Sequence, residues 1–196
     1  MSVVLVDAGG TNIGSVRYAL QRLGVEASLT ADPATIRAAD KVILPGVGAA
    51  GPGMARLRQL GLVDLMRSLT QPVLGVCLGM QLLCARSEEG DSECLGLIPA
   101  PVRHFSRDSG LPVPHMGWNR LQVERTHPLL AGLGADEQAY FVHSYAVPVG
   151  DYSLATADYG GAFSAVIARG NFHGMQFHPE RSATVGAKLL KNFLDL

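Results

Sequence analysis

The chain has 196 residues, with 17 acidic and 16 basic side chains and a formal net charge of −1 at pH 7. This length predicts one domain, residues 1–196, which is long enough to bury a core without disulfides or metals. The near-zero charge and the lack of a basic run argue against a nucleic-acid-binding protein, so no polyanionic partner is expected.

Cysteine usage and the N-terminal segment indicate the cellular compartment of the protein. Three cysteines make an odd count without C-x-x-C spacing, which favours a reducing compartment, the cytoplasm by default. Residues 1–7 lack a basic start and reach an acid after four apolar residues, so we expect a strand there and no signal peptide. No apolar run approaches the roughly 20 residues that a membrane span needs.

The first half of the chain alternates predicted strands and helices. Strands are expected over residues 3–6, 26–30 and 41–44, and a fourth begins at Pro72 and delivers Cys77. Helices are expected over 12–23 with Gly24 as cap, after Asp32-Pro33, between 52 and 69 with a break near Gly61, and after Cys77. This alternation predicts a mostly parallel sheet, with reactive groups at the carboxyl ends of its strands.

The second half has a different pattern. From residue 97 to about 168, short alternating segments such as 140–147 are separated by proline and glycine clusters. Residues 183–196 predict an amphipathic helix with Val185, Leu189, Leu190 and Phe193 facing inward. The predicted fold class is therefore α/β: a three-layer arrangement with a mostly parallel central sheet, flanking helices and an antiparallel or mixed β extension in the second half.

The segment Gly75-Val76-Cys77-Leu78-Gly79 has the pattern of a nucleophile elbow, with sulfur in place of the usual serine oxygen. Cys77 would lie at a helix N-terminus, where free N–H groups and the helix dipole favour a thiolate. The flanking glycines would permit close backbone approach that a Cβ would obstruct. The alternative is a buried structural cysteine in a glycine-rich turn.

A cysteine nucleophile needs a base, and His178 in Gly174–Glu180 is the candidate. If this segment is extended up to Pro179, His178 and Glu180 at i and i+2 point to the same side. The carboxylate would then orient the imidazole and stabilise its protonated form. Alternatively, His178 is a hydrogen-bonded structural residue and Glu180 an ordinary exposed acid.

The loop Pro45-Gly46-Val47-Gly48 follows the third predicted strand. Acyl transfer from an amide passes through an oxyanion, which backbone N–H donors stabilise. A glycine-rich loop presents such donors without side chains that block approach, and the Leu78 N–H is the natural second donor. The alternative is a plain turn between a strand and a helix.

Metal and phosphate sites are poorly supported. His173 and His178 lie five positions apart without a second pair at ligand spacing, and Cys77 and Cys84 lie seven apart. We expect no metal and assign Cys84 to core packing. Residues 7–12 match neither nucleotide-binding motif and predict a turn with a helix N-cap, so no cofactor is expected.

These motifs, in this order, resemble the class I (triad) glutamine amidotransferases, whose fold is flavodoxin-like. The match rests on GVCLGMQ at 75–81, followed by His178-Pro179-Glu180. Within that class, the resemblance is to the glutaminase subunits of imidazole glycerol phosphate synthases. It rests on three further segments: PGVG at 45–48, PHMGWN at 114–119 and QFHPER at 176–181. One departure is Asp7-Ala8-Gly9, where many relatives have tyrosine in the second position.

The resemblance implies hydrolysis of glutamine to glutamate and ammonia without a cofactor. Cys77 would form the γ-glutamyl thioester, His178 would act as base and then acid, and Glu180 would orient His178. Leu78 N–H and the Val47 or Gly48 N–H would form the oxyanion hole. The positions expected to hold glutamine are Gly46, Gln81, Glu89, Ser144 and Tyr145.

The resemblance also implies a heterodimer with a (β/α)₈ cyclase subunit, HisF, which receives the ammonia for histidine biosynthesis. Asn12, Trp118 and Asn119 would face this partner, although a sole tryptophan is also a candidate core residue. The 45–48 loop would change its peptide orientation when the cyclase binds its ligand, because glycines flank Val47.

Three rival functions share part of this pattern. A cysteine hydrolase or peptidase on the same fold would have the elbow but not the 114–119 and 178–180 segments. A glutaminase subunit of another synthase would have the same triad. A non-catalytic regulatory module would have no chemical need to retain Cys77, His178 and Glu180 together.

Overall fold

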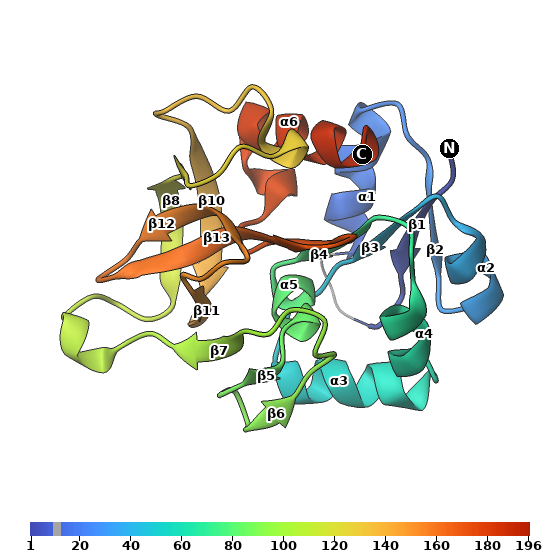
Figure 1. The fold of residues 1–196 in the computed structure, drawn as a ribbon, viewed down its shortest axis with the longest axis horizontal. Coiled ribbons are helices and arrows are strands. Elements are labelled where there is room, and N and C mark those ends of the chain that lie inside the picture. The colour runs from blue at the N-terminus through green and yellow to red at the C-terminus, as the bar shows by residue number, and fades with distance from the viewer. Residues whose placement is uncertain (10–12) are drawn as a thin grey trace.

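The computed structural model describes residues 1–9 and 13–196, with helices on both sides of a central sheet (Figure 1). Its α-helices are α1 (Ile13–Arg22), α2 (Pro33–Ala38), α3 (Ala50–Gln59), α4 (Val63–Ser68), α5 (Leu78–Leu83) and α6 (Ala183–Leu194). Short 3₁₀ turns are η1 (Arg107–Ser109), η2 (Pro128–Leu130) and η3 (Pro179–Arg181). These helices confirm the predicted order, including the break between α3 and α4 at Gly61, whose φ is +67°.

The strands divide the chain as the sequence pattern predicts. The first four are β1 (Val3–Val6), β2 (Ala27–Thr30), β3 (Lys41–Leu44) and β4 (Val73–Val76). The middle strands are β5 (Arg86–Ser87), β6 (Ser92–Glu93), β7 (Pro101–His104), β8 (His115–Arg120) and β9 (Gln122–Val123). The last are β10 (Gln138–His143), β11 (Tyr145–Pro148), β12 (Ser153–Asp158), β13 (Ala162–Arg169) and β14 (Phe172–Met175).

The central sheet contains a parallel half and an antiparallel half. Strands β2, β1, β3, β4 and β14 are neighbours in that order and all run parallel. From β14 onward, β13, β11 and β7 pair antiparallel, with β12 beside β13. The predicted mostly parallel core with an antiparallel extension is therefore confirmed.

One part of the extension differs from the prediction. Strands β8 and β10 form a separate antiparallel pair rather than joining the main sheet. Residues 140–147, expected as one alternating segment, are split at Ser144 into β10 and β11, which belong to different sheets. The chain crosses between the sheets at Ser144, which places backbone polar groups of residues 143–145 beside a cavity.

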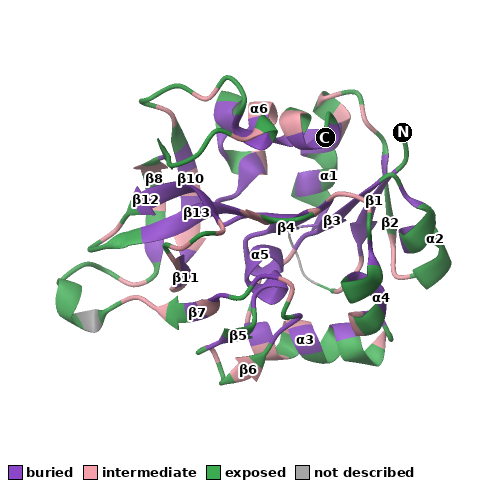
Figure 2. Cartoon of the chain, viewed as in Figure 1, coloured by how far each residue is buried: buried purple, intermediate pink, exposed green. Residues whose placement is uncertain are grey.

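Two apolar clusters lie on the two faces of the central sheet (Figure 2). One includes Val16 of α1 and Phe193 of α6, and the other includes Met54 of α3 and Leu65 of α4. The four inward residues predicted for the last helix are buried. In the part of the chain that the structure describes, no helix has the length and apolar character to cross a membrane.

Candidate active site

Cys77 lies on a sharp turn between β4 and α5. Its φ of 53° and ψ of −110° are values that a non-glycine residue rarely adopts. A Cβ at Gly79 would lie 1.8 Å from the Leu44 carbonyl oxygen, and one at Gly75 would lie 2.5 Å from the Gly79 oxygen. The glycines around Cys77 are therefore required by close backbone approach, as the sequence predicts for a nucleophile elbow.

The strand order explains how distant segments meet at Cys77. Strand β4 lies between β3 and β14, and all three are parallel, so their carboxyl ends share one edge of the sheet. Cys77 follows β4, the 45–48 loop follows β3, and His178 follows β14. Because of this order, two segments that are far from Cys77 in sequence lie on either side of it.

His178 and Glu180 make the predicted contact, but not through the predicted backbone. The strand ends at Met175, and residues 179–181 form the turn η3, so the extended geometry expected up to Pro179 is wrong. Proline at the first position of a 3₁₀ turn is favourable, because the turn needs no N–H there. The turn still brings Glu180 Oε1 to 2.9 Å from His178 Nδ1, and the Glu180 side chain is 1% exposed.

The surroundings of His178 favour its protonated form. Burial alone lowers the pKa of an imidazole, but hydrogen bonds and negative charge from Cys77 and Glu180 outweigh burial and raise the His178 pKa to about 10. The contact with Glu180 uses Nδ1, which assigns Nε2 to the cysteine side of the ring. The three groups thus form a buried chain with a protonated imidazole at its centre.

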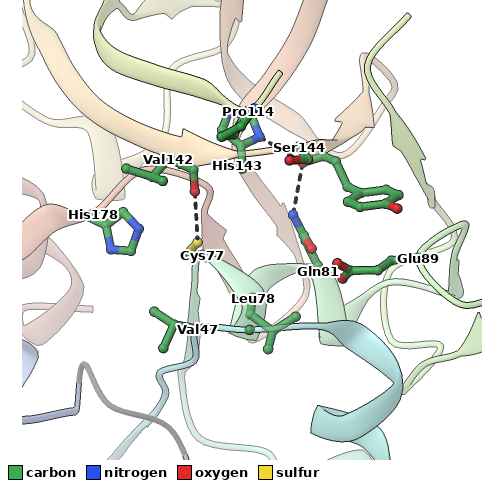
Figure 3. A pocket seen from close by; sticks show the side chains of 12 residues that line it. Val47, Cys77, Leu78, Gln81, Glu89, Pro114, Val142, His143, Ser144 and His178 are labelled. Atoms are coloured by element: carbon green, nitrogen blue, oxygen red, sulfur yellow. Dashed lines mark hydrogen bonds between the residues drawn. The ribbon is translucent and has the colours of Figure 1, made fainter. Parts of the chain in front are cut away.

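A cavity of about 310 Å³ opens beside Cys77 (Figure 3). Its volume is at the lower end of the range for small-molecule pockets. Its lining includes nine of the predicted site residues: Val47, Gly48, Cys77, Leu78, Gln81, Glu89, Ser144, Tyr145 and His178. Glu180 does not line the cavity but contacts the His178 ring. Gly46 contacts the lining residue Leu78 by accepting a hydrogen bond from its N–H.

The end of the cavity away from Cys77 carries hydrogen-bond acceptors. Gln81 uses its amide nitrogen twice, donating to the Tyr145 carbonyl oxygen and to Gln176 Oε1, both at 3.0 Å. The amide oxygen of Gln81 therefore points away from Tyr145, toward the carboxylate of Glu89 (Figure 3). Glu89 is held in place by the Ala50 N–H, which donates to its Oε2 at 2.9 Å.

The predicted oxyanion donors are not all available in this conformation. The Leu78 N–H donates to the Gly46 carbonyl oxygen at 3.3 Å, so the 45–48 loop itself occupies this donor. Within the described residues, neither the Val47 nor the Gly48 N–H donates a hydrogen bond. Gly48 has a φ of +107°, a conformation that L-residues with a Cβ avoid.

The segment 114–119 places apolar side chains on the surface. Trp118 is 52% exposed and Met116 is 62% exposed, so assigning Trp118 to the core would be wrong. Both side chains share one face of β8, and Trp118 packs edge-on against Tyr140, over which the Arg181 guanidinium lies 4.5 Å from the ring centroid. We call these four residues the β8 face. The third predicted interface residue, Asn12, lies outside the described residues.

Some residues around Cys77 were not proposed as site residues from the sequence. Val142 accepts a long contact from the Cys77 thiol at 4.0 Å, and Gln176 Nε2 lies 3.8 Å from Cys77 Sγ. Gln176 opens the 176–181 segment noted in the sequence, but it lies beyond the end of β14, so strand alternation does not identify it. Pro114 and His143 also line the cavity. Pro114 opens the 114–119 segment noted in the sequence, whereas His143 belongs to none of the quoted motifs. Cys84 is buried in the core as predicted, and burial raises the pKa of its thiol.

Comparisons with known proteins agree with this geometry. The profile of the family described as glutamine amidotransferase class-I matches residues 4–196. Imidazole glycerol phosphate synthase subunit HisH of Xanthomonas axonopodis pv. citri is 57% identical over 99% of this chain and 97% of its own length. The subunit of the same name from Xylella fastidiosa strain Temecula1 is 54% identical over the same shares. A crystal structure of a glutamine amidotransferase, 23% identical, has a TM-score of 0.76 over 100% of this chain and 98% of its own, a likeness of fold.

Proposed function

The chain belongs to the class-I glutamine amidotransferase family, and from this premise we propose that it is the glutamine-hydrolysing subunit of an imidazole glycerol phosphate synthase. Two relatives of that name match it over nearly the full length of both chains. The observation that carries the chemistry is the buried chain of Cys77, His178 and Glu180 beside a cavity with acceptors at its far end. We further propose that residues 1–196 form a single glutaminase domain, because both core clusters pack on one continuous sheet.

The proposed reaction begins when the Cys77 thiolate attacks the side-chain amide carbon of glutamine. A C–S bond forms and the carbonyl oxygen becomes an oxyanion. His178, protonated at neutral pH, gives its proton to the amide nitrogen, and ammonia leaves as the C–N bond breaks. A water molecule then attacks the thioester, His178 takes a proton from it, and glutamate leaves as Cys77 is released. Glu180 stabilises the protonated imidazole throughout.

The proposed pocket recognises the amino-acid end of glutamine through polar groups. The Gln81 amide oxygen and the Glu89 carboxylate are acceptors that suit the α-ammonium group, and the Ser144 hydroxyl and the backbone near Tyr145 would contact the α-carboxylate. The side-chain amide then extends toward Cys77. Leu78 N–H, with the Val47 or Gly48 N–H, would bind the oxyanion once the 45–48 loop releases Leu78.

The proposed partner is the cyclase subunit HisF, bound as a heterodimer over the β8 face and Asn119. An exposed tryptophan supported by tyrosine and arginine is typical of interface anchors, in which these residue types are enriched. This face lies on the strand pair adjoining residues 143–145, so a partner bound there would adjoin the pocket wall. The ammonia would pass to that subunit.

The test is glutamate release from glutamine by the purified chain, alone and with HisF and its nucleotide ligand. We expect strong stimulation by the liganded partner and no activity in Cys77→Ala. High activity without any response to HisF would contradict the synthase assignment and favour a glutaminase for another synthase. Normal activity of the Cys77→Ala variant would contradict the proposed nucleophile.

A further inference from the structure

Two buried histidines outside the proposed triad join the pocket wall to the outer strand β8. His143 Nδ1 lies 2.8 Å from the Tyr145 carbonyl oxygen, and His143 Nε2 lies 3.0 Å from His115 Nδ1. His115 Nε2 in turn lies 3.4 Å from the side-chain nitrogen of Asn119. These contacts link Asn119, a half-buried residue of β8, to the carbonyl group that also accepts from Gln81.

The donor and acceptor of each hydrogen bond in this series follow from the Tyr145 carbonyl group at one end and the Asn119 amide group at the other. A carbonyl oxygen only accepts, so His143 Nδ1 carries a proton and donates to Tyr145. Burial lowers the pKa of His143 to about 3 and that of His115 to about 4, so both rings are neutral. His143 Nε2 is therefore an acceptor, and His115 Nδ1 must donate to it. His115 Nε2 then accepts from Asn119, whose amide nitrogen also donates to the Asp158 oxygen at 2.8 Å.

The two rings have little freedom to reorient. His115 is stacked between Phe141 and Tyr159, with ring centroids 5.1 and 4.1 Å away and interplanar angles of 24° and 25°. His143 packs against Phe105 at 5.0 Å and against Phe163 at 5.1 Å. Aromatic packing thus fixes the orientation of the ring N–H groups of His115 and His143.

At the pocket, the Tyr145 carbonyl oxygen accepts from both His143 Nδ1 and Gln81 Nε2, which uses both of its lone pairs. The Tyr145 carbonyl and Gln176 Oε1 both accept from the side-chain nitrogen of Gln81. The position of the Tyr145 carbonyl therefore helps to set the orientation of the Gln81 amide group.

We propose that His143 and His115 are positioning residues for glutamine binding: their fixed tautomers hold the Tyr145 carbonyl, and through it the Gln81 amide oxygen, in place to receive the substrate. This inference rests on the proposed glutaminase function and adds two residues whose hydrogen bonds lead to the Tyr145 carbonyl. Their loss affects recognition of glutamine and leaves the reactivity of the Cys77–His178 pair intact.

The test compares two reagents that both alkylate Cys77 in the full chain. The glutamine analogue 6-diazo-5-oxo-L-norleucine needs the pocket, whereas iodoacetamide needs only the reactive thiol. Three variants separate the contributions. His143→Leu removes the donor to Tyr145, His143→Asn keeps an N–H near the Nδ1 position, and His115→Phe keeps the stack with Phe141 and Tyr159 while removing the donor to His143.

We expect His143→Leu to raise the analogue concentration for half-maximal labelling roughly tenfold, as loss of one buried hydrogen bond does, with little change in the limiting rate. His115→Phe should raise it severalfold, and His143→Asn should recover most of the loss. Iodoacetamide should label all three variants within about twofold of the wild-type rate. Because His115→Phe preserves ring packing, it carries the test if His143→Leu does not fold.

Two results would overturn the proposal. In one, His143→Leu and His115→Phe bind the analogue as the wild type does. In the other, both reagents slow equally in these variants, which indicates a general structural role. Failure of the wild-type chain to react with the analogue, while iodoacetamide still labels Cys77, is a different result: it overturns the glutaminase function and the positioning role with it.

Discussion

The Leu78 N–H donates a hydrogen bond to the Gly46 carbonyl oxygen at 3.3 Å. Leu78 follows Cys77 directly, so its N–H is the donor nearest to an oxyanion formed on the substrate. While Gly46 accepts from it, this donor is occupied by the protein itself. Under the proposed mechanism, we expect the 45–48 loop to move before the Leu78 N–H can bind the oxyanion.

The loop's movement is open to a test at Gly48. Rotating the peptide plane between Val47 and Gly48 by about half a turn would change the Gly48 φ from +107° to a negative value, which alanine prefers. We expect Gly48→Ala to favour the rotated loop, raising glutaminase activity without partner roughly tenfold and reducing stimulation by HisF, given strain of about 1–3 kcal/mol. Steady-state glutamate release checks this.

The matched control is Gly61→Ala. Gly61 also has a positive φ, +67°, and open space where an alanine methyl group would lie, but it is located between α3 and α4, outside the cavity lining. The Gly61→Ala variant should have a free energy of unfolding lower by about 1–3 kcal/mol and an unchanged glutaminase activity. Equal basal activity of Gly48→Ala and wild type would contradict the loop rearrangement.

The elbow predicts a severe effect at Gly79. A methyl group there would lie 1.8 Å from the Leu44 carbonyl oxygen, so the backbone of one of the two segments would have to shift. Gly79→Ala should lower the free energy of unfolding by more than about 3 kcal/mol and abolish glutaminase activity, as overpacking against backbone does. Gly14→Ala in α1, where the nearest atom is a Tyr18 ring carbon at 3.9 Å, should be neutral or slightly stabilising. Urea denaturation of both variants measures the contrast.

The Glu180 carboxylate predicts a pH-dependent contribution to stability. The His178 pKa is about 10 in the folded protein and near 6.5 in an unfolded chain. The bound proton therefore stabilises the fold fully below about pH 6.5, and this stabilisation is lost as the pH rises through about 10. Glu180→Gln should lower the free energy of unfolding by about 2 kcal/mol near pH 6, with a difference that narrows toward pH 10.

Urea denaturation at several pH values between 6 and 10 checks this trend. Asp64→Asn is the control, because Asp64 is 99% exposed and its contact with Arg67 spans 3.9 Å. Its effect should be small and constant over this range. A pH-independent loss in Glu180→Gln would show that the carboxylate does not set the protonation of His178.

The β8 face predicts a loss of partner binding at Trp118. Because its side chain is 52% exposed, Trp118→Ala should leave the free energy of unfolding nearly unchanged. It should weaken binding of HisF by roughly 30-fold or more, as removal of a central aromatic anchor does. Val149→Ala, at an exposed position after β11, should bind normally in titration calorimetry. Unchanged affinity of Trp118→Ala would move the interface elsewhere.

Those parts of the site that depend on local chemistry are predictable from the amino-acid sequence. Gly75 and Gly79 around Cys77 predict a tight turn because a Cβ is sterically excluded there, and the structure has that turn. The alternation of apolar strands and helices predicts the parallel half of the sheet, because side-chain periodicity is visible over a few neighbouring residues. Asp32 likewise caps α2 as its sequence context indicates, accepting from the Thr35 N–H.

The relations between distant segments become visible in the folded chain and are not encoded in any local pattern. The order β3, β4, β14 brings the 45–48 loop, Cys77 and His178 to one edge, and no local pattern encodes which strands become neighbours. The turn at η3, the split at Ser144 and the His143–His115 pair depend on the same pairing. The physical reason is that backbone propensity and side-chain period act over a few residues, whereas strand pairing and the tautomers of buried histidines depend on groups that meet only when the chain is folded.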